Sequence, residues 1–148
     1  MESRCPLTSR SSKTQTDAGP FDQLDYLYTP SRDVASDMRF LVEVLGARVG
    51  FAVEGMGARV AMVILASGPP HLLLADHLDG DRPILVYRVA DLSKATAKLR
   101  KRGLKKQHEV ELPMGPASSF VTKGGHRIAL YEPSRPAVLD HFMGREDF

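Results

Sequence analysis

Cysteine is almost absent from this chain of 148 residues, since Cys5 is its single example. An internal disulfide needs two thiols and cysteine-based zinc or iron–sulfur sites need several, so both are excluded. One cysteine fits a reducing compartment. Long apolar runs are also lacking, because no stretch approaches the roughly 20 apolar residues of a membrane span and the first residues lack the apolar run of a secretion signal. We therefore expect a cytoplasmic protein without a membrane partner.

Signatures of nucleotide binding, nucleophilic catalysis and nucleic-acid binding are missing as well. Gly55-x-Gly57 lies between two β-rich runs and opens no helix, so no phosphate-cradling loop is indicated. No serine lies in a recognisable nucleophile elbow. The basic stretch from Lys98 to Lys106 ends a predicted helix and has no interleaved aromatic residues for base stacking. With a net charge of only +2, the sequence predicts no nucleic-acid partner.

The composition that remains, 43% hydrophobic and 26% charged, suits one globular domain. Residues 1–20 are rich in Ser, Thr, Lys, Arg and Gln and predict a disordered N-terminal tail. Apolar residues at helical spacing predict a helix within 31–46, with Ser31 or Asp33 as its N-cap and Gly46 as its stop. The same plan predicts a second helix over 91–103.

Short β-rich runs between turn-forming residues predict the strands. We expect them at 24–29, 48–54, 59–66, 71–76, 84–89, 107–112, 118–122 and 127–132. The divider before 118–122 is Pro113-Met114-Gly115-Pro116. A short helix is expected within 136–143.

This order of elements, one strand, one helix and three strands, occurs twice. Three pairs of equivalent residues are 56 to 58 positions apart: Asp33 and Asp91, Gly46 and Gly103, and Leu74 and Leu130. The shared spacing indicates an internal repeat. We expect an α+β fold in which two tandem βαβββ repeats, 21–78 and 82–133, form a curved, cup-like mixed sheet. Helices would cover its outer face, its inner surface would be open for a ligand, and 134–148 would form a C-terminal extension.

Three stretches carry a resemblance to a known family. They are Leu24-Asp25-Tyr26 with Asp33 and Val44-Leu45-Gly46, then Val89-Ala90-Asp91-Leu92, then Phe120 with the run from Gly125 to Pro133. Together they resemble the vicinal oxygen chelate (VOC) superfamily, which includes glyoxalases, bleomycin-resistance proteins and extradiol dioxygenases. The resemblance covers 24–133 and implies the cup-like fold. It also implies a homodimer, in some members with repeats exchanged between chains.

The resemblance further implies four metal ligands, one from the first and one from the fourth strand of each repeat. The matching positions are Tyr26, Leu73, Ile84 and Ala129. Leu, Ile and Ala side chains have no donor atom, and a neutral tyrosine is a poor ligand. We therefore expect the family's metal site to be lost and predict no cofactor.

Strand alternation places the candidate ligand-binding residues on one face of the sheet. An apolar floor with tyrosine hydroxyls at its rim would bind a small organic molecule. Other interpretations stay open: the aromatic residues fill the inner face or a subunit contact, His71 is solvated at the rim, and Arg127 is exposed beside a turn. The candidate ligand-binding set is Tyr26, Tyr28, His71, Leu73, Ile84, Val86, Arg127, Ala129 and Tyr131.

Two functions from different classes fit these residues. The first is a metal-independent, non-catalytic protein that binds a small organic molecule in the cup. The alternative is a VOC-type lyase, isomerase or dioxygenase with shifted metal ligands, or with Tyr26, Tyr28 or His71 as general acid or base. A third possibility is a cup filled by its own side chains or by a partner chain.

Overall fold

The computed structural model describes residues 19–112 and 114–148, so most of the predicted tail, with Cys5, lies outside the described residues. One sheet of eight strands dominates the structure. No helix within the described ranges has the length and hydropathy to cross a membrane. In chain order the elements are β1 (Gln23–Pro30), α2 (Val34–Glu43), β2 (Arg48–Gly55), β3 (Ala58–Ile64), β4 (His71–Ala75), β5 (Ile84–Arg88), α3 (Leu92–Lys101), β6 (His108–Leu112), β7 (Gly115–Val121), β8 (Arg127–Tyr131) and α4 (Ala137–Phe142).

Local capping explains where the two long helices begin and end. The Asp33 side chain accepts a hydrogen bond from the Ser36 amide at 3.0 Å, and Asp91 does the same for Lys94 at 3.0 Å. Gly46 and Gly103 follow the helices with positive φ. This left-handed conformation commonly ends a helix, and glycine adopts it without strain because it has no Cβ. The predicted caps and stops are therefore confirmed.

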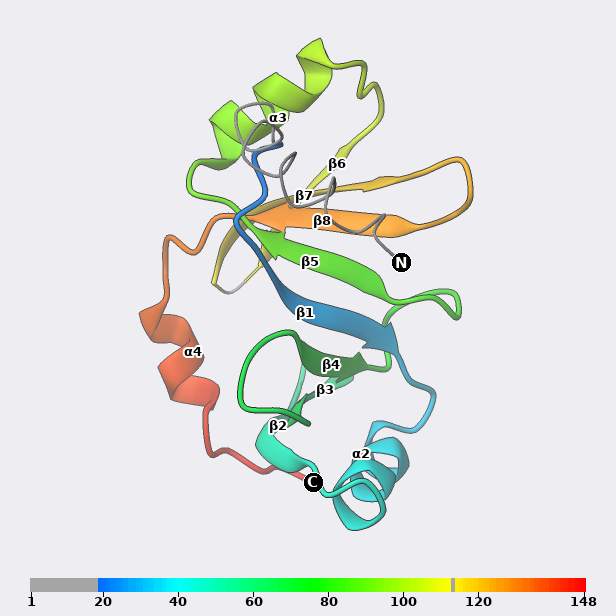
Figure 1. Cartoon of the computed structure of the whole chain (residues 1–148). Coiled ribbons are helices and arrows are strands. Elements are labelled where there is room, and N and C mark those ends of the chain that lie inside the picture. Colours follow the sequence, from blue (N-terminus) through cyan, green and yellow to red (C-terminus); the bar gives the residue numbers. More distant parts are fainter. Residues whose placement is uncertain (1–18, 113) are drawn as a thin grey trace, which may run out of the picture.

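The strand pairing repeats itself within the sheet, whose order is β2-β3-β4-β1-β5-β8-β7-β6. β1 pairs in parallel with β4, and β5 pairs in parallel with β8. The two halves meet where β1 and β5 pair antiparallel at the centre. Figure 1 shows the curved sheet with α3 beside one half and α2 beside the other. The predicted α+β fold of two βαβββ repeats is confirmed.

Alternation along the strands divides the core between two faces of the sheet. On the outer face, Val34 and Met38 of α2 pack with Leu74, and Ala95 of α3 packs with Leu130. The inner face holds the larger and more aromatic cluster. Its buried members are Tyr26, Phe51, Met62, Leu73, Val86, Ala117, Ala129 and Tyr131.

The last residues of the chain return to the inner face and to the free edge of β2. Leu139 and Phe142 of α4 pack against the inner-face cluster. Beyond α4, residues 144–148 form what we call the C-terminal strap, which continues the hydrogen bonding of the sheet beside β2. Ala52 donates its amide to the Arg145 carbonyl at 2.7 Å and accepts from the Asp147 amide at 2.6 Å. This segment covers an edge that would otherwise expose unpaired backbone groups.

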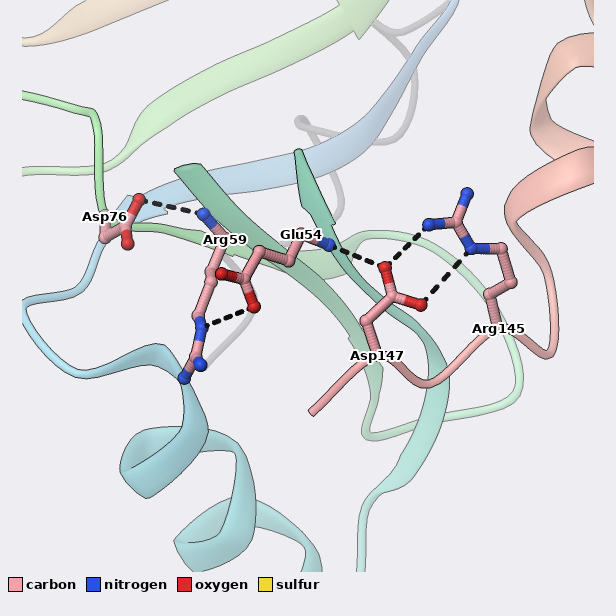
Figure 2. Close-up of polar contacts among 5 residues, drawn as sticks. All are labelled: Glu54, Arg59, Asp76, Arg145 and Asp147. Atoms are coloured by element: carbon pink, nitrogen blue, oxygen red, sulfur yellow. Dashed lines mark hydrogen bonds and ion pairs between the residues drawn. The ribbon is translucent and has the colours of Figure 1, made fainter. Parts of the chain in front are cut away.

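Side chains anchor the strap as well. The Asp147 carboxylate accepts from the Glu54 amide at 2.9 Å and from Arg145 Nη2 at 2.6 Å (Figure 2). On the next strand, Arg59 donates to Glu54 through Nε at 3.2 Å and to Asp76 through its backbone amide at 3.0 Å. The Asp147–Glu54 bond ties the strap to β2, and the Arg59 bonds hold β3 to β2 and to the residue that follows β4.

The start of β7 differs from the sequence prediction by three residues, more than any other strand boundary. β7 begins at Gly115, inside the segment expected to divide two strands. A Cβ at Gly115 would lie 1.9 Å from the Glu132 carbonyl oxygen, so only glycine permits this close approach to the residue after β8. Pro116 then accepts a hydrogen bond from the Glu132 amide at 3.1 Å.

Candidate functional site

A β-bulge in β1 gives the inner face an unexpected acidic residue. The β1–β5 register shifts between Leu24 and Tyr26, so Asp25 is an extra residue in β1. Simple alternation would point Asp25 away from the face that Tyr26 occupies. In the structure both are buried, and the Asp25 carboxylate lies beside Tyr131 of the inner face.

The Asp25 carboxylate has three protein partners. Tyr131 donates its hydroxyl to Oδ2 at 2.5 Å, and Gln23 Nε2 donates to Oδ1 at 2.6 Å. Arg88 Nε lies 3.6 Å from Oδ2. A buried carboxylate needs such compensation because burial removes its hydration.

The tyrosines of the inner face are held protonated. Burial raises the pKa of Tyr131, and its hydrogen bond to Asp25 raises it further. Burial followed by the charge of Asp25 raises the pKa of Tyr26, and burial raises that of Tyr28. At neutral pH these hydroxyls therefore remain able to donate hydrogen bonds.

His71 has a buried side-chain nitrogen, Nδ1, without a hydrogen-bond partner among the described residues. It begins β4, where it pairs with Tyr26 of β1. It lines a cavity of about 280 Å³ together with Gln23, Asp25, Arg88 and Tyr131, which we call the polar cavity.

A second cavity adjoins the first and is apolar. It has a volume of about 170 Å³, and all the side chains that line it are aliphatic, aromatic or methionine. Tyr26, Met114 and Leu139 line both cavities, so the two are neighbours. The residues that line only this apolar cavity include Tyr28, Phe51, Val53, Leu73, Val86 and Phe142.

The structure gathers most of the predicted site residues at these cavities. Tyr26, Tyr28, His71, Leu73, Val86 and Tyr131 line one or both. Ala129 is buried in the inner-face cluster, and Ile84 packs against it.

Arg127 is placed differently, because it lines neither of these two cavities. Its Nη1 donates to the Asp79 carbonyl at 2.8 Å and its Nη2 donates to the Arg82 carbonyl. The side chain thus fastens the connection between the two repeats.

The donor chemistry does not fit the metal that the fold family implies. Tyr26 pairs with His71 in one repeat, and Ile84 pairs with Arg127 at the equivalent place in the other. Three of the four ligand positions implied by the resemblance, Leu73, Ile84 and Ala129, offer only hydrocarbon. Across the described ranges, no three His, Cys, Asp or Glu side chains gather into a possible metal site.

Four residues that line the cavities were not predicted from the sequence: Asp25, Arg88, Leu139 and Phe142. Arg88 lies two and four residues after Val86 and Ile84, so alternation could have placed it on the inner face. Asp25 gave no such signal, because its inward position depends on the bulge. Leu139 and Phe142 depend on the path of residues 132–148 across the inner face.

Comparisons with known proteins show where this arrangement belongs. No family model and no curated protein sequence matches the chain. Among solved structures, it is similar to methylmalonyl-CoA epimerase from Mycobacterium tuberculosis, with a TM-score of 0.68 and 19% identity over 81% of this chain and 93% of that one. A Streptomyces coelicolor methylmalonyl-CoA epimerase variant in complex with 2-nitronate-propionyl-CoA has a TM-score of 0.61 and 17% identity over 77% and 96%.

A hypothetical protein from Bacillus halodurans C-125 is also similar, with a TM-score of 0.60 and 12% identity over 74% of this chain and 93% of that one. The epimerases are VOC proteins. The chain therefore has the VOC fold, and the fold that the resemblance implies is confirmed. At these identities the likeness shows the fold alone.

Proposed function

We propose that this protein binds a small, mainly apolar organic molecule in its cup. The observation that carries the proposal is the apolar cavity of about 170 Å³, which adjoins a polar cavity of about 280 Å³. Small-molecule sites typically combine an apolar lining with a few polar groups and occupy roughly 300–1,000 Å³. Neither cavity reaches that volume alone, but the two neighbouring cavities together do, and they combine an apolar lining with a few polar groups.

Unfilled apolar space supports the same proposal. Apolar surface that stays open to water costs roughly 25 cal/mol per Å² relative to the same surface buried. One valine enlarged to phenylalanine would remove part of this cost. Because Val53 and Val60 line the cavity and remain small, the space is better explained by an occupant than by packing alone.

The neighbouring structures give limited support. The Streptomyces coelicolor epimerase was solved in complex with 2-nitronate-propionyl-CoA, so the same fold holds an organic ligand in that protein. The proposal for this chain rests on its own cavities.

The neutral fluorescent probe N-phenyl-1-naphthylamine tests the proposal. We expect saturable, 1:1 binding to the full chain with increased, blue-shifted emission. Val53→Phe and, separately, Val60→Phe fill the cavity and should weaken binding by about tenfold or more, since the bound probe loses apolar contact. Val121→Phe is the matched control, because Val121 is 61% exposed at the end of β7.

Each variant is first checked for a cooperative thermal transition. Absence of saturable binding to the wild type would refute the proposal. Unchanged affinity in two folded cavity variants would refute it equally, since the probe would then bind elsewhere.

His71 favours a second candidate, proton-transfer catalysis. Its unpartnered Nδ1 and the protonated hydroxyl of Tyr26 lie on paired strands and would serve as base and acid. The test is incubation in D₂O with methylmalonyl-CoA, the compound named for the neighbouring epimerases, followed by proton NMR. Deuterium exchange that Tyr26→Phe or His71→Ala abolishes, with probe affinity retained, would support catalysis. Absence of exchange would leave this candidate without support for that substrate.

A further inference from the structure

We infer that the polar cavity recognises the carboxylate of an amphipathic ligand, with Arg88 and His71 as the groups that bind it. The inference rests on the proposed function and specifies the class of molecule: a monocarboxylic acid with an aromatic or branched apolar body. It follows from which hydrogen-bonding groups of the cavity are already satisfied and which are not.

The negative group of the cavity is already satisfied. Asp25 is 8% exposed, and Gln23 and Tyr131 donate to its two oxygens at 2.6 and 2.5 Å. Arg88 approaches the same carboxylate at 3.6 Å. Arg88 already places a positive charge opposite this carboxylate, so a cationic ligand would be repelled by Arg88 and would compete with Gln23 and Tyr131 for the same two oxygens.

The positive and donating groups of the cavity are not satisfied. The Arg88 side chain is 42% exposed and faces Asp25 through Nε alone. Its two terminal nitrogens have no hydrogen-bond partner in the described part of the chain, and they present the planar geometry that matches a carboxylate. His71 Nδ1 is buried and equally unpartnered there, and in the Nδ1-protonated form it donates one further hydrogen bond. The surplus of donors calls for a ligand that brings acceptor oxygens.

The two cavities together set the orientation of the ligand. Tyr26 and Leu139 line both, so a bound molecule can pass from one to the other beside them. Its carboxylate would lie at Arg88 and His71, and its apolar body would lie among Tyr28, Phe51 and Val86. Charge at one end and hydrocarbon at the other distinguish this class from a uniformly apolar ligand.

The test compares 2-naphthoate with 2-naphthamide, which share an apolar body and differ in charge. Isothermal titration of the full chain at neutral pH should give affinity for naphthoate about tenfold higher, as expected for a charge-assisted hydrogen bond. Arg88→Gln and His71→Phe should each reduce that ratio severalfold. Arg48→Gln, the same change at an exposed residue that begins β2, should leave it unchanged.

The outcomes separate this inference from the proposed function. Equal affinity for the two probes, or a ratio that both cavity variants retain, overturns the inference and leaves binding in the cup intact. If N-phenyl-1-naphthylamine, naphthoate and naphthamide all fail to bind, the proposed function fails. If Arg88→Gln does not fold, the affinity ratio measured for His71→Phe tests the inference by itself, because that substitution leaves the Asp25 contacts in place.

Discussion

At the scale of single residues, the main feature is the buried Asp25 and the hydroxyl that satisfies it. Tyr131 comes from the last strand of the second repeat and Asp25 from the first strand of the first repeat, 106 residues apart. Their hydrogen bond joins the two repeats inside the cup. Its contribution to stability should be measurable because one buried acceptor loses a partner when the hydroxyl is removed.

We predict that Tyr131→Phe lowers the free energy of unfolding by about 1–3 kcal/mol, the usual cost of a lost bond to a buried polar group. Denaturation in guanidinium chloride provides the measurement. Tyr87→Phe removes the same atom from a hydroxyl that has no hydrogen bond among the described residues, and it should change stability little. Equal losses in the two variants would contradict this account of Asp25.

The raised pKa values of Tyr26, Tyr28 and Tyr131 predict a dependence on alkaline pH. A group whose pKa is raised by folding contributes stability below its unfolded pKa, and this contribution is lost as pH rises through the folded pKa. We therefore expect stability to fall above pH 10.0, the ordinary tyrosine value. In an absorbance titration, tyrosine ionisation in the folded protein should lag behind that of the unfolded chain. Coincident curves would show that these hydroxyls are not buried.

At the scale of elements, the parts set by local chemistry could be predicted and the parts set by distant contacts could not. Asp33 caps α2 with an amide three residues away, so the sequence alone predicted where the helix begins. The bulge at Asp25 arises from pairing with β5. The start of β7 at Gly115 depends on close contact with the Glu132 carbonyl, and the residues next to Gly115 in the sequence do not indicate that contact.

Gly115→Ala should destabilise the fold by about 2–4 kcal/mol, because the new Cβ would meet the Glu132 carbonyl at 1.9 Å and the backbone must shift. Gly55→Ala is the control, since an added Cβ there meets nothing within 4 Å. Thermal denaturation compares the two. A similar transition temperature for both variants would contradict the close contact between β7 and the segment after β8.

The C-terminal strap should loosen in acid. Hydrogen bonds from Arg145 and the Glu54 amide hold the pKa of Asp147 below its ordinary 3.8. A lowered pKa stabilises the strap above pH 3.8, and this effect is lost as pH falls through the folded pKa. We expect Asp147→Asn to speed hydrogen exchange at the Ala52 and Glu54 amides at neutral pH, and to do so much less at acidic pH.

Asp140→Asn changes an exposed carboxyl of α4 in the same way and provides the control. Exchange at Ala52 and Glu54 should match the wild type in this variant. Equal protection of these amides in Asp147→Asn and wild type at neutral pH would show that the carboxylate does not anchor the strap.

At the scale of the whole molecule, the internal repeat carried most of the prediction. Its spacing identified equivalent positions on β1, β4, β5 and β8. Residues of these strands that were predicted to face the cup, Tyr26, Leu73, Val86 and Ala129, all lie in the inner-face cluster. Alternation predicted Tyr131 and His71 and could have placed Arg88, but the inward position of Asp25 depends on the bulge in β1. The sequence therefore predicts the shape of the cup better than its chemistry.

The sheet also has consequences for assembly. The C-terminal strap covers the β2 edge, whereas no other strand of the described residues lies on the far side of β6. Exposed strand edges are common sites of association. We predict a homodimer, as the resemblance implies, and light scattering at micromolar concentration should report twice the mass of the 16.3 kDa chain. A monomeric mass would contradict the prediction.

Methyl NMR during titration with N-phenyl-1-naphthylamine shows whether an organic molecule binds inside the cup. Leu73 and Leu74 are neighbours in β4 on opposite faces of the sheet, and Val53 and Val63 offer a second such contrast. We expect saturable shifts at Leu73 and Val53 with little change at Leu74 and Val63. Shifts confined to the outer-face methyls, or none in any of the four residues, would contradict binding in the cup.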